Sequence, residues 1–144
     1  MYSRSPEYTS LEEFISPEQN EPIDSHWTTA RIRRRLQITE FEVRMWSEQM
    51  RLLEARTKGG LSVFPSFQFV QKAGVWSVLT GLHEVLEPFK SVIGDNMSGW
   101  ELASLINAPS RTLDDKSIVD YLKQGGDVTR PLAITRNIAS NWSK

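Results

Sequence analysis

The sequence of 144 residues contains no cysteine. Disulfide bonds and thiolate zinc sites are therefore excluded, and packing of side chains must supply the stability. The sequence also lacks any run of eighteen apolar residues, and the first 21 residues hold no apolar segment of the signal-peptide kind. We therefore expect a cytoplasmic protein with no membrane-bound part.

Catalytic motifs are equally scarce. His26 and His83 are the only histidines, and no acidic residue stands at a metal-ligand spacing from either. The sequence has no Gly-x-Ser-x-Gly nucleophile elbow, no phosphate loop ending in Gly-Lys-Ser, and no Gly-x-Gly-x-x-Gly fingerprint. Adjacent carboxylates at Asp114 and Asp115 diverge on a helix, so they do not form an acid-base pair. We expect no enzyme activity, no metal and no cofactor.

What the sequence does contain is an uneven distribution of charge behind a net charge of −1. Residues 1–25 include one basic and six acidic residues, a net charge of −5, whereas residues 26–58 include eight basic and four acidic residues, a net charge of +4. A positive segment suits phosphate binding because it releases counterions from nucleic acid, although a solvated helix face has the same composition. Three prolines among polar residues predict that 1–25 is an irregular acidic tail.

Helix signals begin after Trp27. Either Thr28 or Thr29 can cap a first short helix that ends near Leu36. Thr39 can cap a second helix, with Glu42 three residues later to complete a capping box. In this helix Val43, Trp46 and Met50 recur at spacings of three and four and should face inward, whereas Arg44 and Ser47 should face outward. Two short helices with a tight connection predict a helix-turn-helix.

A predicted β-hairpin follows these helices. Residues 52–56 and 61–64 are short apolar runs on either side of Lys58-Gly59-Gly60, where glycine can supply a positive φ. Beside a helix-turn-helix, such a hairpin is a wing that contacts the sugar-phosphate backbone. A hairpin of an unrelated mixed fold gives the same pattern, so this alternative stays open.

We expect these elements to bind double-stranded DNA. The first helix and the hairpin would hold phosphates, and the second helix would read base edges in the major groove. The candidate DNA-binding residues are Arg33, Arg34, Thr39, Glu40, Arg44, Ser47, Arg51, Arg56 and Lys58. Because a single helix-turn-helix seldom buries enough surface for tight specific binding, we also expect a homodimer.

The second half of the chain has several further helix signals. Apolar residues between Val75 and Phe89 recur at helical spacing, with Pro88 expected to interrupt the helix. Ser98 and Glu101 form another capping box, Ser117 can cap a short helix that stops at Gly125, and Asp127 can cap the last helix. This pattern predicts a C-terminal bundle of short helices.

Two stretches resemble known families. Residues 30–69, which end in the Pro65-Ser66-Phe67-Gln68-Phe69 element, resemble the winged-helix start of small bacterial regulators related to the mercury-resistance regulator and excisionase groups. A later set is similar to the C-terminal domain of Xre/MbcA/ParS-type antitoxins, and it comprises Trp100, Leu102, Ala103, Leu105, Asn107, Pro109, Leu113, Asp114, Ile118, Leu122 and Gly125. The two resemblances together cover roughly residues 28–140.

The expected fold is mainly α, with a winged helix-turn-helix and its small β-hairpin in 26–72 and a helical antitoxin-like or dimerisation module in 73–144. Two functions remain open. One is a transcriptional regulator that binds DNA. The other is an antitoxin or phage-type inhibitor whose helical module neutralises a partner protein such as a toxin. In that case Trp100, Leu113 and Tyr121 would contact the partner. The alternative for Trp100 and Tyr121 is a place in the core, because large aromatic residues on amphipathic helices usually point inward.

Overall fold

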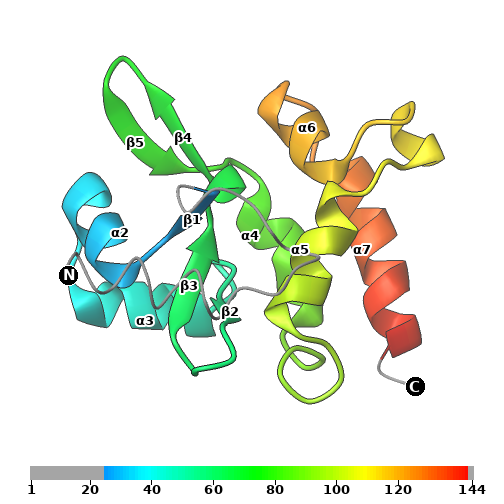
Figure 1. Ribbon diagram of the computed structural model, residues 1–144. Helices are drawn as coiled ribbons and strands as arrows, with labels where there is room; N and C mark the ends of the chain where they lie inside the picture. The colour runs from blue at the N-terminus through cyan, green and yellow to red at the C-terminus, as the bar shows by residue number, and fades with distance from the viewer. Residues whose placement is uncertain (1–24, 143–144) are drawn as a thin grey trace.

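The computed structural model describes residues 25–142. The acidic tail predicted for 1–25 lies outside the described residues except for Ser25. Helices make up most of the regular structure, in agreement with the mainly α expectation, and short antiparallel strands accompany them (Figure 1). Within residues 25–142, no helix combines the length and the apolar character that crossing a membrane requires.

The first half begins with strand β1 (His26–Trp27), helix α2 (Thr29–Leu36) and helix α3 (Glu40–Glu48). The Thr28 hydroxyl accepts a hydrogen bond from the Arg31 N–H and caps α2. Thr39 and Glu42 form the predicted capping box at the start of α3, with distances of 3.1 and 2.9 Å between the bonded atoms. Both predicted helices are therefore confirmed.

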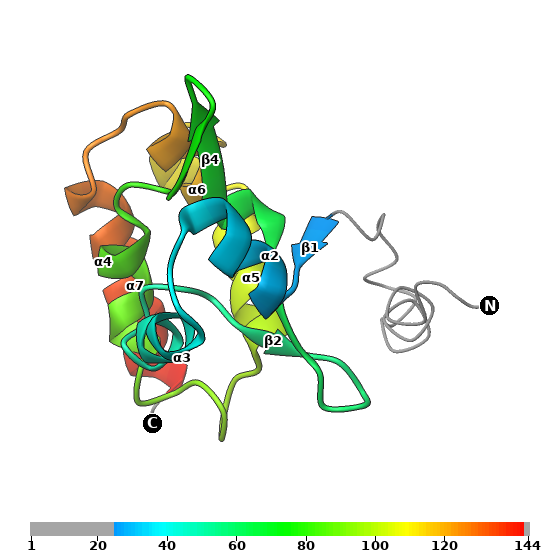
Figure 2. The same cartoon turned by 90° about the vertical axis from the view of Figure 1, so that its left-hand side faces the viewer.

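The predicted hairpin is also confirmed. Strand β2 (Ala55–Arg56) pairs antiparallel with β3 (Ser62–Pro65), and Gly60 in their loop has a φ of +85°. Strand β3 pairs on its other side with β1, so the sheet order is β1-β3-β2. The loop between β2 and β3 projects from the body of the molecule (Figure 2).

A second hairpin contradicts the helix expected from Val75 onward. After a short 3-10 turn, η3 (Ser66–Gln68), strand β4 (Phe69–Lys72) pairs with β5 (Val75–Val78), and Ala73 and Gly74 turn with positive φ. Val75 is 67% exposed and does not lie on a buried helix face, which its spacing from Val78 had predicted. Pairing with β4 satisfies the backbone of this segment instead. The boundary predicted between residues 72 and 73 thus falls within a hairpin.

The remaining chain is helical. Its elements are α4 (Leu82–Leu86), the 3-10 turn η4 (Glu87–Phe89), α5 (Gly99–Asn107), the 3-10 turn η5 (Arg111–Leu113), α6 (Ile118–Lys123) and α7 (Thr129–Trp142). Pro88 lies in η4, where the helix was expected to be interrupted. Ser98 and Glu101 form the predicted capping box of α5, and Ser117 caps α6. The Asp127 carboxylate accepts from the Thr129 N–H at the start of α7.

Two apolar clusters lie at the centre of the two halves. The smaller is built on Trp27, Ile32, Val43, Leu52, Phe64 and Phe69, and the larger gathers residues of α4 to α7. Met50 and Leu53, which follow α3, belong to the larger cluster. The segment between α3 and β2 is therefore packed against the C-terminal helices as well as joining α3 to the hairpin.

The buried Gln68 side chain connects these parts. Its amide oxygen accepts from the Leu53 N–H at 2.8 Å, and its amide nitrogen donates to the carbonyls of Leu53 and Pro65 at 2.9 and 3.0 Å. The two bonds to Leu53 hold the chain before β2 against the chain after β3, whereas the bond to Pro65 is local to the turn after β3. The hairpin thereby has a fixed base from which its loop extends.

Candidate nucleic-acid interface

A groove of about 350 Å³ separates α3 from the β2–β3 hairpin. Its lining comes from both elements and from the start of α2, and comprises Thr29, Glu40, Val43, Arg44, Ser47, Glu48, Glu54, Arg56, Ser62 and Phe64. Four residues proposed from the sequence, Glu40, Arg44, Ser47 and Arg56, therefore line the same groove. The tertiary structure brings them together although they come from a helix and a strand.

Glu54 ties the two walls of this groove to each other. Its carboxylate accepts from the Ser47 hydroxyl of α3 at 2.7 Å and from the Ser62 hydroxyl of β3. It also pairs with the guanidinium of Arg56, whose Nη2 lies 3.3 Å from Oε2. The Glu54 side chain is only 25% exposed, so these bonds form in a partly desolvated environment where they are stronger than at the surface. One carboxylate therefore links α3 to both strands of the hairpin.

The outward face of α3 carries opposite charges. Arg44 and Glu40 lie one turn apart with 3.8 Å between Nη2 and Oε2, and both side chains are about two-thirds exposed (67% and 63%). Such an exposed pair contributes little stability, and Arg44 can exchange Glu40 for another acceptor at small cost. Thr39, by contrast, uses its hydroxyl for the helix cap. Its role in the structure is to begin α3.

The other basic residues proposed from the sequence are not among those that line the groove. Arg33 and Arg34 are exposed in the last turn of α2, and Lys58 is exposed in the hairpin loop. Arg51 stacks its guanidinium on Trp46, 4.5 Å from the ring centroid, and borders a separate depression toward α4. The structure therefore does not bring Arg51 to the wall formed by Arg44 and Arg56.

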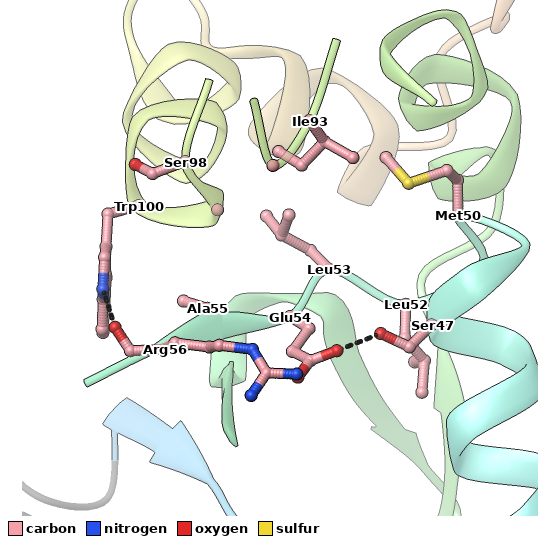
Figure 3. A pocket seen from close by; sticks show the side chains of 12 residues that line it. Ser47, Met50, Leu52, Leu53, Glu54, Ala55, Arg56, Ile93, Ser98 and Trp100 are labelled. Carbon is pink, nitrogen blue, oxygen red and sulfur yellow. Dashed lines mark hydrogen bonds and ion pairs between the residues drawn. The ribbon is translucent and has the colours of Figure 1, made fainter. Parts of the chain in front are cut away.

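A second cavity, of about 330 Å³, lies where the first half meets α5 (Figure 3). Trp100 borders it, and its indole N–H donates to the Arg56 carbonyl at 2.8 Å. Nearby, Gly99 approaches the backbone of Glu54 so closely that a Cβ there would lie 2.0 Å from the carbonyl oxygen. The N-terminus of α5 is thus seated directly on strand β2. Trp100, expected to contact a partner, holds the hairpin strand within this chain.

The other two expected partner residues also pack internally. Leu113 is fully buried in the larger core, so its side chain presents no surface to a partner in this structure. Tyr121 is half-buried, with the Arg130 guanidinium 5.7 Å from its ring centroid and Gly126 against its edge. All three residues expected to bind a partner therefore have roles inside the chain.

Metal binding finds no support in residues 25–142, where no three histidine, aspartate or glutamate side chains gather closely enough to hold an ion. His26 lies edge-on to Trp100, with 5.1 Å between ring centroids, and its Nδ1 lies 2.7 Å from the Ser25 hydroxyl. His83 Nδ1 lies 3.3 Å from the Met50 carbonyl. Both histidines are thus engaged in contacts within the fold.

Sequence reasoning missed three residues of this interface. Glu54 and Ser62 gave no signal because their partners lie seven and eight residues away on other elements. For Phe41 the sequence does contain a signal, because an apolar residue two positions before Val43 falls outside the inward face of α3. The structure leaves Phe41 65% exposed on that helix.

Comparisons with known proteins are sparse. No known protein family matches the chain, and no curated protein is similar to it in sequence. Among solved structures, the chain is similar to the one described as "NMR structure of Rv2175c", with a TM-score of 0.52 and 17% sequence identity. The similarity covers 88% of this chain and 81% of the other. At this identity the likeness concerns the fold alone.

Proposed function

We propose that this protein is a DNA-binding regulator whose α2, α3 and β2–β3 hairpin form a winged helix-turn-helix. The observation that carries the proposal is the groove in which Arg44 of α3 faces Arg56 of the hairpin, with two capped helices on one side and a three-stranded sheet on the other. The order of strand, two helices and hairpin, with β3 pairing with both β1 and β2, supports this proposal.

The distribution of charge fits such a role. Arg33, Arg34 and Lys58 are exposed, so they are free to meet the sugar-phosphate backbone. Neutralising phosphates supplies affinity for any sequence. Glu40 and Glu48 are exposed on α3 and border the groove. There, a carboxylate can accept a hydrogen bond from the N4 amino group of cytosine, and Arg44 can bind the O6 and N7 atoms of guanine.

We further propose that the protein binds DNA as a dimer on two half-sites about one helical turn apart. One such unit buries too little surface for tight specific binding. The alternative of a partner-neutralising inhibitor gains no specific support. Trp100, Leu113 and Tyr121, its candidate contact residues, contact other parts of this chain. We therefore base the proposed function on the first half of the chain.

A salt titration with two variants tests this function. A duplex selected from a random-sequence pool by the purified protein is compared with a scrambled duplex of the same length. We expect Arg34→Ala to weaken both duplexes about equally and to reduce the slope of log affinity against log salt by about one unit. Arg44→Ala should instead lose discrimination of roughly 1–3 kcal/mol at one base-pair position.

Arg136→Ala is the matched control, since Arg136 is exposed on α7 in the other half of the chain. It should leave the affinity and the salt slope unchanged. Absence of binding to every duplex at low salt would disprove the proposed function. An unchanged ratio of selected to scrambled affinity in Arg44→Ala would show that α3 is not the recognition helix.

A further inference from the structure

Phe41 is an unusual residue for the outward face of α3. It is 65% exposed, although aromatic side chains contribute most to stability when they are buried. Successive helical residues are rotated by about 100°, which places Phe41 roughly 140–160° around the axis from Val43 and Trp46. These two residues pack into the smaller core. Phe41 therefore projects almost directly away from the body of the protein.

Its neighbours in the first turn of α3 have partners within the chain. The Thr39 hydroxyl and the Glu42 carboxylate are joined in the capping box, and the Glu40 carboxylate pairs with Arg44. Phe41 is the first-turn side chain with the most apolar surface left open to an approaching ligand. In a helix-turn-helix, residues near the N-terminus of the second helix contact base edges.

We infer that Phe41 is a specificity-determining residue that contacts the C5-methyl group of a thymine in the major groove of duplex DNA. The inference rests on the proposed function and deepens it. A phenyl ring has no hydrogen-bonding group, so it cannot read the polar edges of guanine, adenine or cytosine. The thymine methyl is the apolar feature of the major groove, and phenylalanine is among the side chains that contact it.

Charged side chains on α3 disfavour an apolar protein surface as the ligand of Phe41. Arg44, one turn along α3, lies about 60° from Phe41 around the axis, and Glu48 lies about 20° from it two turns along. Both are exposed. An apolar partner would have to desolvate these two charges, whereas base edges beside the thymine would give each a hydrogen-bonding group. The surface around Phe41 thus matches a mixed polar and apolar groove.

Replacing thymine by deoxyuridine tests the contact because it removes only the methyl group. The probe is a duplex selected by the wild-type protein from a random-sequence pool, with each thymine replaced in turn. For the wild type we expect one or two positions per half-site at which the replacement weakens binding about threefold to fivefold, the factor for burying one methyl group. Phe41→Ala should bind the unmodified duplex less tightly and should be insensitive to deoxyuridine at those positions.

Val75→Ala is the matched control. Val75 is 67% exposed, nearly the same fraction as Phe41, but lies on the β4–β5 hairpin. It should keep the wild-type response to deoxyuridine. Thermal unfolding and sedimentation should show that both variants fold and assemble as the wild type does, since neither removes a buried side chain.

The outcomes separate the two proposals. If the selected duplex is bound with preference but deoxyuridine weakens wild type and Phe41→Ala equally, or nowhere, the thymine contact is overturned and the proposed function stands. If Phe41→Ala dissociates the dimer, Phe41 belongs to an interface between two copies and the inference is likewise overturned. If no duplex is bound, both proposals fail.

Discussion

Gln68→Met should destabilise this protein more than its conservative shape suggests. Methionine has almost the length of glutamine, so the substitution fills the same space while removing the amide group. In the structure that amide forms three hydrogen bonds to backbone groups, with distances of 2.8, 2.9 and 3.0 Å. Gln68 has no exposed surface, and water cannot replace these bonds without opening the core.

The magnitude follows from the groups left behind. The N–H and the carbonyl of Leu53 both depend on Gln68, and a buried backbone group without a partner costs about 1–3 kcal/mol. Loss of both gives about 2–6 kcal/mol, against a total stability of about 5–15 kcal/mol for an ordinary domain. For a chain of this length, that loss lowers the melting temperature by roughly 8–24 °C.

Thermal unfolding followed by circular dichroism measures the effect, with urea unfolding as a second estimate. Gln71→Met is the control, because Gln71 is exposed on β4 and the substitution is chemically identical. It should change the melting temperature by no more than about 2 °C, as surface substitutions usually do. If Gln68→Met melts as close to the wild type as the control does, the hydrogen bonds of Gln68 do not hold the hairpin in place.

Three further predictions concern the ties between elements. Glu54→Ala should lower the free energy of unfolding by about 1–2 kcal/mol because it frees Ser47, Arg56 and Ser62 together; urea unfolding measures this, and an equal effect of the exposed Glu48→Ala would contradict it. Trp100→Phe should cost about 0.5–1.5 kcal/mol by removing the bond to the Arg56 carbonyl, whereas Trp142→Phe at the exposed end of α7 should cost almost nothing. Hydrogen bonds from the backbone and side chain of Thr129 lower the pKa of Asp127, so its stabilising effect is present above the pKa of the unfolded chain and is lost as the pH falls through the lowered value. The difference in unfolding free energy between wild type and Asp127→Ala should therefore shrink on acidification, and a difference that grows instead would exclude this cap.

Features that depend on neighbours in the chain could be read from the sequence. The capping boxes of Thr39 with Glu42 and of Ser98 with Glu101 each lie within three residues, and both were predicted correctly. The same holds for the β2–β3 hairpin, whose loop needs a residue with positive φ and has Gly60 there. In each case the bonding partners are close in sequence, so the pattern contains the whole interaction.

Interactions between distant segments were decided only by the tertiary structure. Periodicity favoured a helix through Val75 and Val78, but pairing with β4 and contact with α2 made this segment a strand. The motif around Trp100 suggested a partner-binding residue. In the structure its indole N–H donates instead to the carbonyl of Arg56 in β2, 44 positions earlier in the chain. Nothing in the sequence indicated the role of Glu54. Its carboxylate links two elements only because the fold places two hydroxyls and a guanidinium around it. A local sequence pattern predicts the hydrogen bonds within one segment. Tertiary packing determines which groups of distant segments come into contact.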